Sequence, residues 1–318
     1  MSVTQAMVMA GALILALGID HVLGEPAERW HPVVWVGRYL DWAALCFVPT
    51  VQGSSHSRRI FVQGAVYWCL GAGVVVALFT GFEHAVKQLH PVLAIFFIGV
   101  ALKPLLAMAM LCSEVVAVEV ALNQSLPLGR TRLSRLVSRE TQDLSASQVR
   151  EAAMETLAEN LNDSVISPIL WFVLGGLPAA ALYRYANTAD AMWGYPGMRN
   201  GRDWRWAGKW AARADDVLSW PGARLTAALV WACSGLRWPW AVLSEQARQT
   251  PSPNSGWPMA AFALALGVRL GKPGAYCLNP QAELATSAHL AAALLLARKV
   301  LLAGVLSALS AIILIVLL

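Results

Sequence analysis

The sequence predicts an all-α, polytopic membrane protein. Three observations lead to this prediction: an excess of apolar residues, several nearly charge-free stretches of membrane-spanning length, and the absence of the alternating pattern of strands. Of the 318 residues, 57% are hydrophobic and 14% are charged, whereas soluble domains are typically about 45–50% apolar and about 25% charged. We expect about four or more transmembrane helices, together with re-entrant or broken helices and helical loops.

Four stretches are expected to cross the membrane. Residues 300–318 contain no charged side chain, and a span needs roughly 20 mostly apolar residues. Residues 60–80 and 91–111 are also long enough, although the second contains Lys103. Residues 6–19 are apolar with no Lys or Arg before them, so we expect a first helix that is retained and not a cleaved signal peptide.

Basic residues predict the orientation in the membrane, because Lys and Arg of short loops concentrate on the cytoplasmic side. Residues 81–90 contain one Lys or Arg, residues 112–163 contain five, and residues 184–222 contain six. We therefore expect 112–163 and 184–222 to be cytoplasmic loops of a single membrane domain, 1–318, in the bacterial inner membrane. Residues 81–90 and the C-terminus should then face the periplasm.

This orientation constrains the apolar stretch 165–182, which lies between the two basic loops. A single crossing there would place the loops on opposite sides. The stretch contains two prolines and a Gly-Gly pair, which interrupt helices and occur where backbone is buried in protein or lines a cavity. We expect a re-entrant or broken element, with a plain span and an unrecognised partner span as the alternative.

An acidic run precedes this stretch. On a helix, side chains four residues apart lie on one face, and like charges at that spacing destabilise an isolated helix by a few tenths of a kcal/mol per pair. One interpretation is a solvated face balanced by Arg150; the other is a magnesium site, because magnesium takes carboxylate oxygens and keeps waters and substrate phosphate. Four carboxylates make up the face: Glu151, Glu155, Glu159 and Asp163.

A second cluster, residues 183–195, mixes amide, hydroxyl, carboxylate and aromatic groups. It suits either substrate binding or a helix cap within an aromatic belt at the membrane surface. Arg184, Asn187 and Asp190 are its candidate functional residues.

A third cluster places adjacent carboxylates, Asp215 and Asp216, beside Arg213 and close to Arg224. Such a set suits a phosphate with its metal ion, although an ion-pair network would have the same composition. Nucleic acid is not an expected partner, since the net charge of +5 is accompanied by no nucleic-acid-binding motif.

Together these segments resemble the adenosylcobinamide-phosphate synthases, the membrane enzymes of cobalamin biosynthesis. The matching blocks follow one another in family order from about residue 20 to residue 280. Two positions depart from the pattern, because Glu25 and Glu140 stand where the family leads us to expect aspartate. The blocks contain Asp20, Gly24, Pro26, His31 and Pro32, then Glu155, Glu159, Asn160, Asp163 and Ser164, then Asn187, Thr188, Asp190, Asp215, Asp216 and Arg224, and finally Pro253, Asn254, Lys272 and Tyr276.

The resemblance implies an ATP- and magnesium-dependent ligase that joins an amino-alcohol phosphate to adenosylcobyric acid on the cytoplasmic side. The amino alcohol, the acyl-phosphate or adenylate intermediate, the oligomeric state and association with other late cobalamin enzymes stay open. The implied catalytic residues are Glu155, Glu159, Asn160, Asp163, Asn187 and Asp190. The implied substrate- and phosphate-binding residues are Arg184, Arg213, Arg224, Asn254 and Lys272, and the implied metal ligands are Glu159, Asp163, Asp215 and Asp216.

Two other functions fit parts of the sequence. A corrinoid transporter could also contain Lys103 in an apolar segment and a broken helix, but most polar groups here lie outside the predicted spans. A non-catalytic membrane regulator of the beta-lactamase-induction type is the second alternative, and the retained acidic and amide motifs favour catalysis over it. Corrin-ring genes beside this gene would support the synthase.

Overall fold

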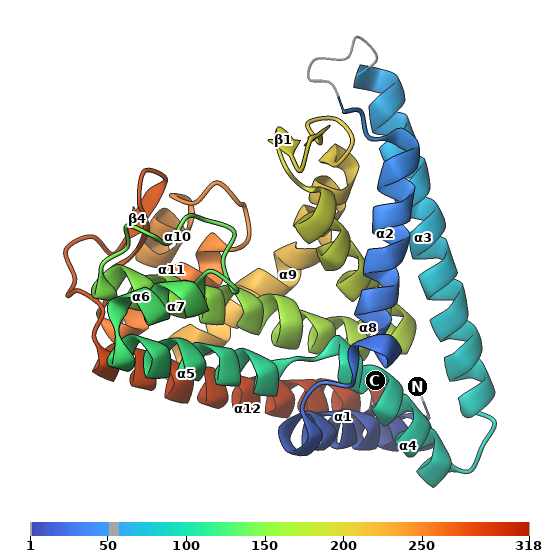
Figure 1. The fold of residues 1–318 in the computed structure, drawn as a ribbon. Coiled ribbons are helices and arrows are strands. Elements are labelled where there is room, and N and C mark those ends of the chain that lie inside the picture. The colour runs from blue at the N-terminus through green and yellow to red at the C-terminus, as the bar shows by residue number, and fades with distance from the viewer. Residues whose placement is uncertain (1, 51–56, 318) are drawn as a thin grey trace. The chain divides into compact units, whose positions relative to one another are not determined.

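The computed structural model describes residues 2–50 and 57–317, and nearly all of their regular structure is helical (Figure 1). This confirms the predicted all-α class. Contacts within the chain separate it into two compact units, each described below by itself. Unit 1 comprises Met1–Leu106, Pro168–Ser219 and Ser310–Leu318, and unit 2 comprises Ala107–Ser167 and Trp220–Leu309.

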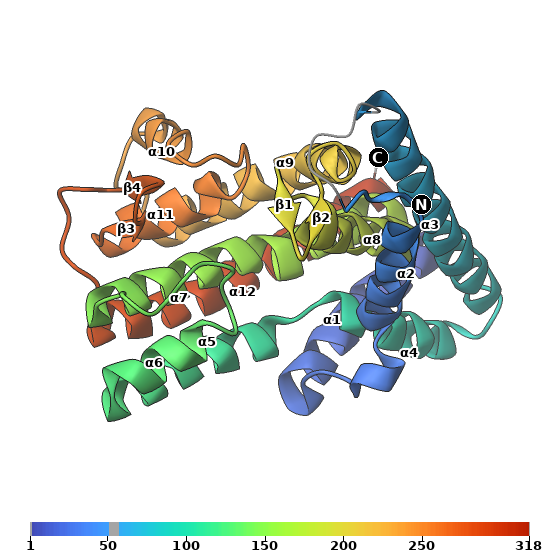
Figure 2. The same ribbon diagram turned by 45° about the horizontal axis from the view of Figure 1, so that its top comes forward.

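In unit 1, helix α1 packs along α4, and α2 lies beside α3 (Figures 1 and 2). Its core combines small aliphatic and aromatic side chains: Trp68 and Trp193 are buried, and the hydroxyl of Tyr185 donates to the carbonyl oxygen of Trp68 at 3.0 Å. The elements are α1 (Val3–Leu23), η1 (Glu28–Trp30), α2 (Pro32–Phe47), α3 (Ser57–Val86), α4 (Pro91–Leu102), η2 (Lys103–Leu105), most of α8 (Ser167–Trp193), the hairpin β1 (Met198–Arg199) and β2 (Arg202–Asp203), and the start of α9 (Lys209–Cys233).

In unit 2, helix α5 packs against α6 and α7, and α11 packs against α7 and α10. A short antiparallel hairpin, β3 with β4, lies against α7. The elements are α5 (Met108–Gln124), α6 (Leu126–Leu133), α7 (Ala146–Leu161), the π-helical segment η3 (Asn162–Ile166), the end of α9, α10 (Trp240–Ala247), α11 (Gly256–Leu266), β3 (Leu270–Lys272), β4 (Tyr276–Leu278) and α12 (Ser287–Leu317), which is in unit 2 up to Leu309.

Five helical stretches in the described residues are long and apolar enough to cross a membrane. They include all four stretches expected from the sequence, extended at their ends; Leu318 of the last stretch lies outside the described residues. The five are Val3–Leu23, Ser57–Val86, Pro91–Gln124, Ala146–Trp193 and Ser287–Leu317.

Helix α8 is broken at the Gly-Gly pair, as expected for residues 165–182. Gly176 has φ +69° and ψ −161°, a conformation that favours glycine. The backbone N–H of Leu177, freed by the break, donates to the carboxylate of Glu83 at 2.8 Å, and Lys87 pairs with the same carboxylate. A Cβ on Gly176 would lie 2.7 Å from a Glu83 oxygen. Any other residue at this position would therefore strain the backbone and clash with the Glu83 carboxylate.

Residues 112–163 form most of α5, all of α6 and α7, and the start of η3, so this predicted loop is largely helical, as expected. One feature differs from the all-helical expectation. The hairpins β1–β2 and β3–β4 were not expected, because strands of two or three residues are too short for the alternating pattern to be visible. Gly274, with φ +74°, allows the tight turn between β3 and β4.

Candidate functional site

The acidic face lies on α7, which begins with a capping box. The Ser145 side chain accepts the backbone N–H of Gln148, and the Gln148 side chain accepts the backbone N–H of Ser145. This cap fixes the start of the helix, and therefore the face on which residues 151, 155 and 159 lie. Glu151 and Glu155 are each only 2% exposed. The interpretation of these two carboxylates as a solvated face is therefore wrong.

Two arginines from other segments neutralise the buried carboxylates. Arg139, in the loop before α7, forms an ion pair with Glu155, and its guanidinium also donates to the carbonyl oxygen of Gly271 at 3.4 Å. Arg269, just before β3, lies 3.1 Å from Glu151. The acidic face is thus held by cations brought to it by the tertiary fold.

Arg150, expected from the sequence to balance this face, has a different partner. It contacts the Glu119 carboxylate of α5 through two guanidinium nitrogens at 2.8–3.1 Å. Arg150 therefore joins α7 to α5, and the prediction that it balances the acidic face is wrong.

The β3–β4 hairpin brings two further polar side chains to α7. Glu159 interacts electrostatically with Asp163 and Glu155, which carry like charge, and with Lys272 of β3, which carries opposite charge. Burial raises the pKa of Tyr276 on β4, and the nearby Glu155 carboxylate raises it further. The Tyr276 phenol therefore stays protonated and can act as a hydrogen-bond donor. We call Glu155, Glu159, Asp163, Lys272 and Tyr276 the α7 cluster.

The π-helical segment η3 places Asp163 on the edge of a buried polar network. The side-chain amide of Asn162 donates to Asp163 Oδ1 at 2.7 Å, and Asn162 Oδ1 accepts hydrogen bonds from Ser167 at 2.8 Å and Thr226 at 3.1 Å. Asn162 is 1% exposed. A π-turn adds a residue to the helical turn, and such turns are frequent at functional sites. Here Asn162 points into the protein, and its amide orients the Asp163 carboxylate beside it.

Arg224 and Asn254, two predicted substrate-binding residues, contact each other. The Arg224 guanidinium donates to Asn254 Oδ1 and, at 2.9 Å, to the carbonyl oxygen of Pro253. It also lies over the rings of Trp220 and Trp257, 4.9 Å and 4.8 Å from their centroids. These contacts join α9 to the loop before α11, and burial lowers the pKa of Arg224. Substrate binding by this pair stays a prediction.

On α8 in unit 1, the Arg184 guanidinium donates to Asn187 Oδ1 at 3.4 Å, which brings two predicted residues together. Asp190 lies against Gly194, where an added Cβ would approach its carboxylate to 1.9 Å. The close approach explains the glycine, and catalysis by Asn187 and Asp190 stays a prediction. Asn160, in unit 2, donates its side-chain amide to the Thr156 carbonyl oxygen at 3.0 Å.

On α9, the Asp215 carboxylate accepts a hydrogen bond from Ser219, whose hydroxyl also lies 3.3 Å from that of Tyr183. Burial raises the pKa of Asp216, and Arg213 is exposed. These residues belong to unit 1, whereas the α7 cluster belongs to unit 2.

A metal site with three protein ligands is not found among residues 2–50 and 57–317, where no three His, Cys, Asp or Glu side chains form a suitable group. Magnesium, however, is usually bound by one or two carboxylates, with waters and substrate phosphates completing its shell. The neighbouring carboxylates of Glu159 and Asp163 fit this donor chemistry. The assignment of magnesium to them, and to Asp215 and Asp216, stays a prediction.

Sequence reasoning missed three residues around the α7 cluster. Tyr276 lies in a matching block and Arg139 directly precedes Glu140, but nothing in the local spacing connects either residue with Glu155. Asn162 stands within the acidic run, but it is not a carboxylate and lies off the four-residue spacing of the acidic face. The local signal that could have found Arg139 is the expectation that a cation must balance the acidic face.

Comparisons with known proteins give one consistent result. The CobD/Cbib protein family model matches residues 13–310. The probable cobalamin biosynthesis protein CobD of Methanothermobacter thermautotrophicus is 39% identical over 272 residues, covering 84% of this chain and 86% of the relative. The cobalamin biosynthesis proteins CobD of Chromobacterium violaceum and Brucella suis are 37% and 35% identical, and each match covers 83% of this chain and 82% of the relative. No solved structure matches. The chain belongs to the CobD/Cbib protein family.

Proposed function

We propose that this chain is a membrane-bound ligase of cobalamin biosynthesis. It uses ATP to join an amino-alcohol phosphate, such as 1-amino-2-propanol O-2-phosphate, to adenosylcobyric acid, giving adenosylcobinamide phosphate. Family membership supports the pathway, because the curated relatives are named cobalamin biosynthesis proteins. The observation that carries the reaction class is the α7 cluster, in which carboxylates, a lysine and a protonated phenol gather at one place in unit 2.

The chemistry requires activation of a carboxylate. A carboxylate oxygen of adenosylcobyric acid attacks a phosphorus of ATP, and either ADP or pyrophosphate leaves. The amine nitrogen then attacks the activated carbonyl carbon, the carbon–oxygen bond breaks, and phosphate or AMP departs with that oxygen while a base takes the amine proton. The site must therefore bind phosphate oxygens and stabilise the charge that develops on them.

The α7 cluster has suitable groups for each part of this task. Glu159 and Asp163 would hold magnesium, which would neutralise part of the negative charge of the ATP phosphates. Asn162 fixes the direction of the Asp163 carboxylate through its 2.7 Å hydrogen bond. Lys272, which interacts with Glu159, binds a phosphate oxygen as a point charge. Tyr276 donates a hydrogen bond to an oxygen of the substrate or of ATP.

Arg139 has a positioning role in this proposal. Its guanidinium is occupied by Glu155 and the carbonyl of Gly271, so it joins α7 to the β3–β4 hairpin that carries Lys272. The ion pair therefore sets the distance between the acidic face and the lysine. Substrate contacts by Arg184, Asn187, Asp190 and Arg213, and metal binding by Asp215 and Asp216, are further parts of the proposal.

The proposed location is the bacterial inner membrane, with the site facing the cytoplasm, where ATP is present. The five apolar helices support a membrane protein, and the basic residues of 112–163 and 184–222 support the orientation.

Reconstitution tests the proposal directly. The full chain, purified in detergent, is mixed with adenosylcobyric acid, aminopropanol phosphate and Mg-ATP, and the corrinoid mass is followed. We expect the corrinoid to gain the amino-alcohol phosphate less one water, with ADP or AMP formed in equal amount; which nucleotide appears identifies the intermediate. An unchanged corrinoid mass at all magnesium and ATP concentrations, with each candidate amino-alcohol phosphate, would contradict it.

A further inference from the structure

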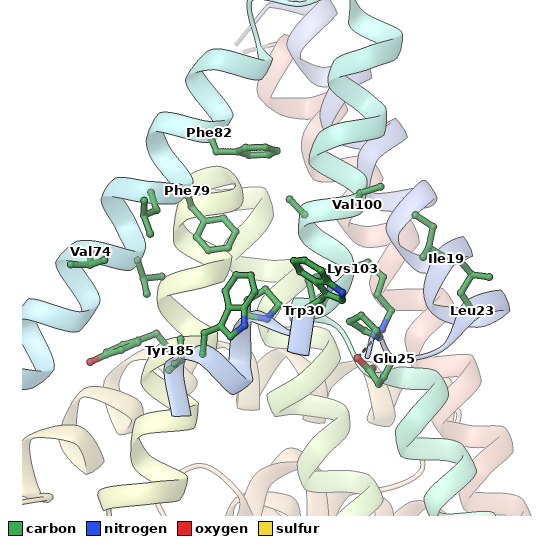
Figure 3. Close-up of a pocket in the computed structure, with 18 of the residues that line it drawn as sticks. Ile19, Leu23, Glu25, Trp30, Val74, Phe79, Phe82, Val100, Lys103 and Tyr185 are labelled. Carbon is green, nitrogen blue, oxygen red and sulfur yellow. Dashed lines mark ion pairs between the residues drawn. The ribbon is translucent and has the colours of Figure 1, made fainter. Parts of the chain in front are cut away.

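Unit 1 contains a cavity of about 1150 Å³ that the proposed reaction does not use (Figure 3). Its walls come from α1, α2, α3 and α4, with Tyr185 of α8. Figure 3 shows Phe79 and Phe82 of α3 facing Val100 of α4 and Ile19 of α1 across the cavity, and Glu25 beside Lys103 at a distance from Phe82. Nearly all of the wall is hydrocarbon, and Glu25 and Lys103 are the two charged residues that line it.

The charged end of the cavity is an ion-paired group with an excess of negative charge. Lys103 is 4% exposed, and its ammonium lies 2.9 Å from Glu25 and 3.2 Å from Asp20. His31 Nε2 lies 3.1 Å from the same Glu25 oxygen, and its Nδ1 accepts the backbone N–H of Val33. Because Nδ1 is an acceptor, the ring is neutral. Two carboxylates and one ammonium therefore leave the group with a net charge of −1.

Glu25 also has an acceptor that the protein does not use. Its Oε1 atom is buried and has no hydrogen-bond partner in the described part of the chain. Burial by itself raises the pKa of Glu25, but hydrogen bonds from His31 and Lys103 and attraction to the Lys103 ammonium outweigh it and lower the pKa, so the carboxyl is ionised at neutral pH. Because buried polar atoms are normally hydrogen-bonded, we expect a molecule in the cavity to donate a hydrogen bond to this carboxylate oxygen.

The position of Glu25 along α1 matches the depth of a lipid headgroup. Helix α1 has 21 residues, which is long enough to cross the hydrocarbon core, and it ends two residues before Glu25. Trp30 and Trp35, which also line the cavity, are 65% and 49% exposed, as aromatic side chains at the membrane surface are. The apolar walls, on three helices of membrane-spanning type, lie at the depth of the acyl chains.

We propose that this cavity binds one phospholipid whose headgroup carries a primary ammonium, a phosphatidylethanolamine. Its acyl chain fills the space between α1, α3 and α4, and its ammonium donates to Glu25 Oε1. Phosphatidylcholine carries a positive charge but no N–H donor, and phosphatidylglycerol has hydroxyl donors but a net negative charge. Neither lipid therefore offers both a positive charge to the negatively charged group and a hydrogen-bond donor to Glu25 Oε1.

Native mass spectrometry of the full chain in detergent tests this proposal. The protein is exposed to an equimolar mixture of phosphatidylethanolamine, phosphatidylglycerol and phosphatidylcholine with identical chains. We expect one retained phosphatidylethanolamine, favoured about tenfold over the other two lipids, as one charge-assisted hydrogen bond allows. Glu25→Gln should bring the three lipids to near parity. Equal retention of all three by the natural chain, or no retained lipid, would overturn the proposal.

A matched pair of substitutions on α3 tests the place of binding without touching the ion pairs. Val74 lines the cavity and is 59% exposed; Val66 is two turns earlier, is 50% exposed and does not line it. Val74→Trp fills part of the cavity and should lower phosphatidylethanolamine retention at least fivefold, whereas Val66→Trp should leave it unchanged. Equal retention by the two variants would show that the lipid is bound elsewhere. Ligase activity is not part of either readout, so the result is independent of the proposed function.

Discussion

Removing Arg139 is expected to destabilise unit 2, because it leaves a buried carboxylate without its cation. The Glu155 carboxylate is almost completely buried, and the Arg139 side chain is 13% exposed. Breaking a buried pair by removing one partner typically costs about 3–5 kcal/mol. In Arg139→Met, Glu155 can take up a proton to limit this cost, so we expect about 3 kcal/mol near pH 7 and less at lower pH.

Thermal unfolding in detergent measures this effect. At about 2 °C per kcal/mol for a chain of this size, Arg139→Met should lower the apparent unfolding temperature by about 6 °C. Arg132→Met is the matched control, since Arg132 pairs with Glu114 on neighbouring helices of the same unit, but their side chains are 25% and 30% exposed. Such pairs contribute about 1 kcal/mol or less, so the control should shift by about 2 °C or less.

The double variant Arg139→Met/Glu155→Gln separates a lost ion pair from a lost packing contact. Removing the charge as well as its partner should recover more than half of the lost stability, because the buried group is then neutral. Equal shifts of the unfolding temperature in Arg139→Met and Arg132→Met, or a double variant no more stable than Arg139→Met alone, would show that the ion pair does not stabilise unit 2.

Three further predictions concern other parts of the chain. Asn162→Ala should slow conversion at least tenfold by releasing Asp163, while raising the magnesium concentration needed for half-maximal rate; a change in stability alone would contradict the positioning role. Glu83→Gln should lower stability by about 1–2 kcal/mol, because the Leu177 N–H loses a charged acceptor, and an unchanged unfolding temperature would contradict it. Because the pKa of Glu25 is lowered in the folded state, its ionised carboxylate stabilises the fold at pH values above the unfolded-state pKa of about 4.3, and this stabilisation is lost as pH falls through the folded-state pKa. Glu25→Gln should therefore flatten the dependence of unfolding temperature on pH in this range. An unchanged dependence would contradict the ion pairing of Glu25.

The features that were predictable from the sequence are those encoded by neighbouring residues. Apolar length identifies the spans, and the Gly-Gly pair with Pro178 predicts the break in α8. The spacing of the acidic run predicts a shared helical face, and Glu151 and Glu155 do lie on the buried side of α7. Each of these signals depends on backbone preferences or on helical period, which act within a few residues.

The features that could not be predicted depend on contacts between distant segments. Arg150 is adjacent to Glu151 in sequence, yet its position on the helix directs it to Glu119, while Arg139 comes from a loop to bind Glu155. The Glu83 carboxylate that caps the second half of α8 is 94 residues from Leu177. The hydrogen bond between Thr226 and Asn162 likewise joins residues 64 positions apart, so the sequence could not show that Asn162 is held in place to orient Asp163.

Amide formation by the α7 cluster is tested by the substitution Glu159→Gln. The substitution keeps the shape of the side chain and replaces a carboxyl group that lies among like charges with a neutral amide, so the protein should remain folded and its unfolding temperature should not fall. Conversion of adenosylcobyric acid by the purified variant should drop at least a hundredfold, with Arg132→Met converting at the natural rate in the same assay. Near-normal conversion by Glu159→Gln and by Asp163→Asn, at unchanged magnesium dependence, would show that the α7 cluster is not catalytic and leave Asp215 and Asp216 as the better candidates.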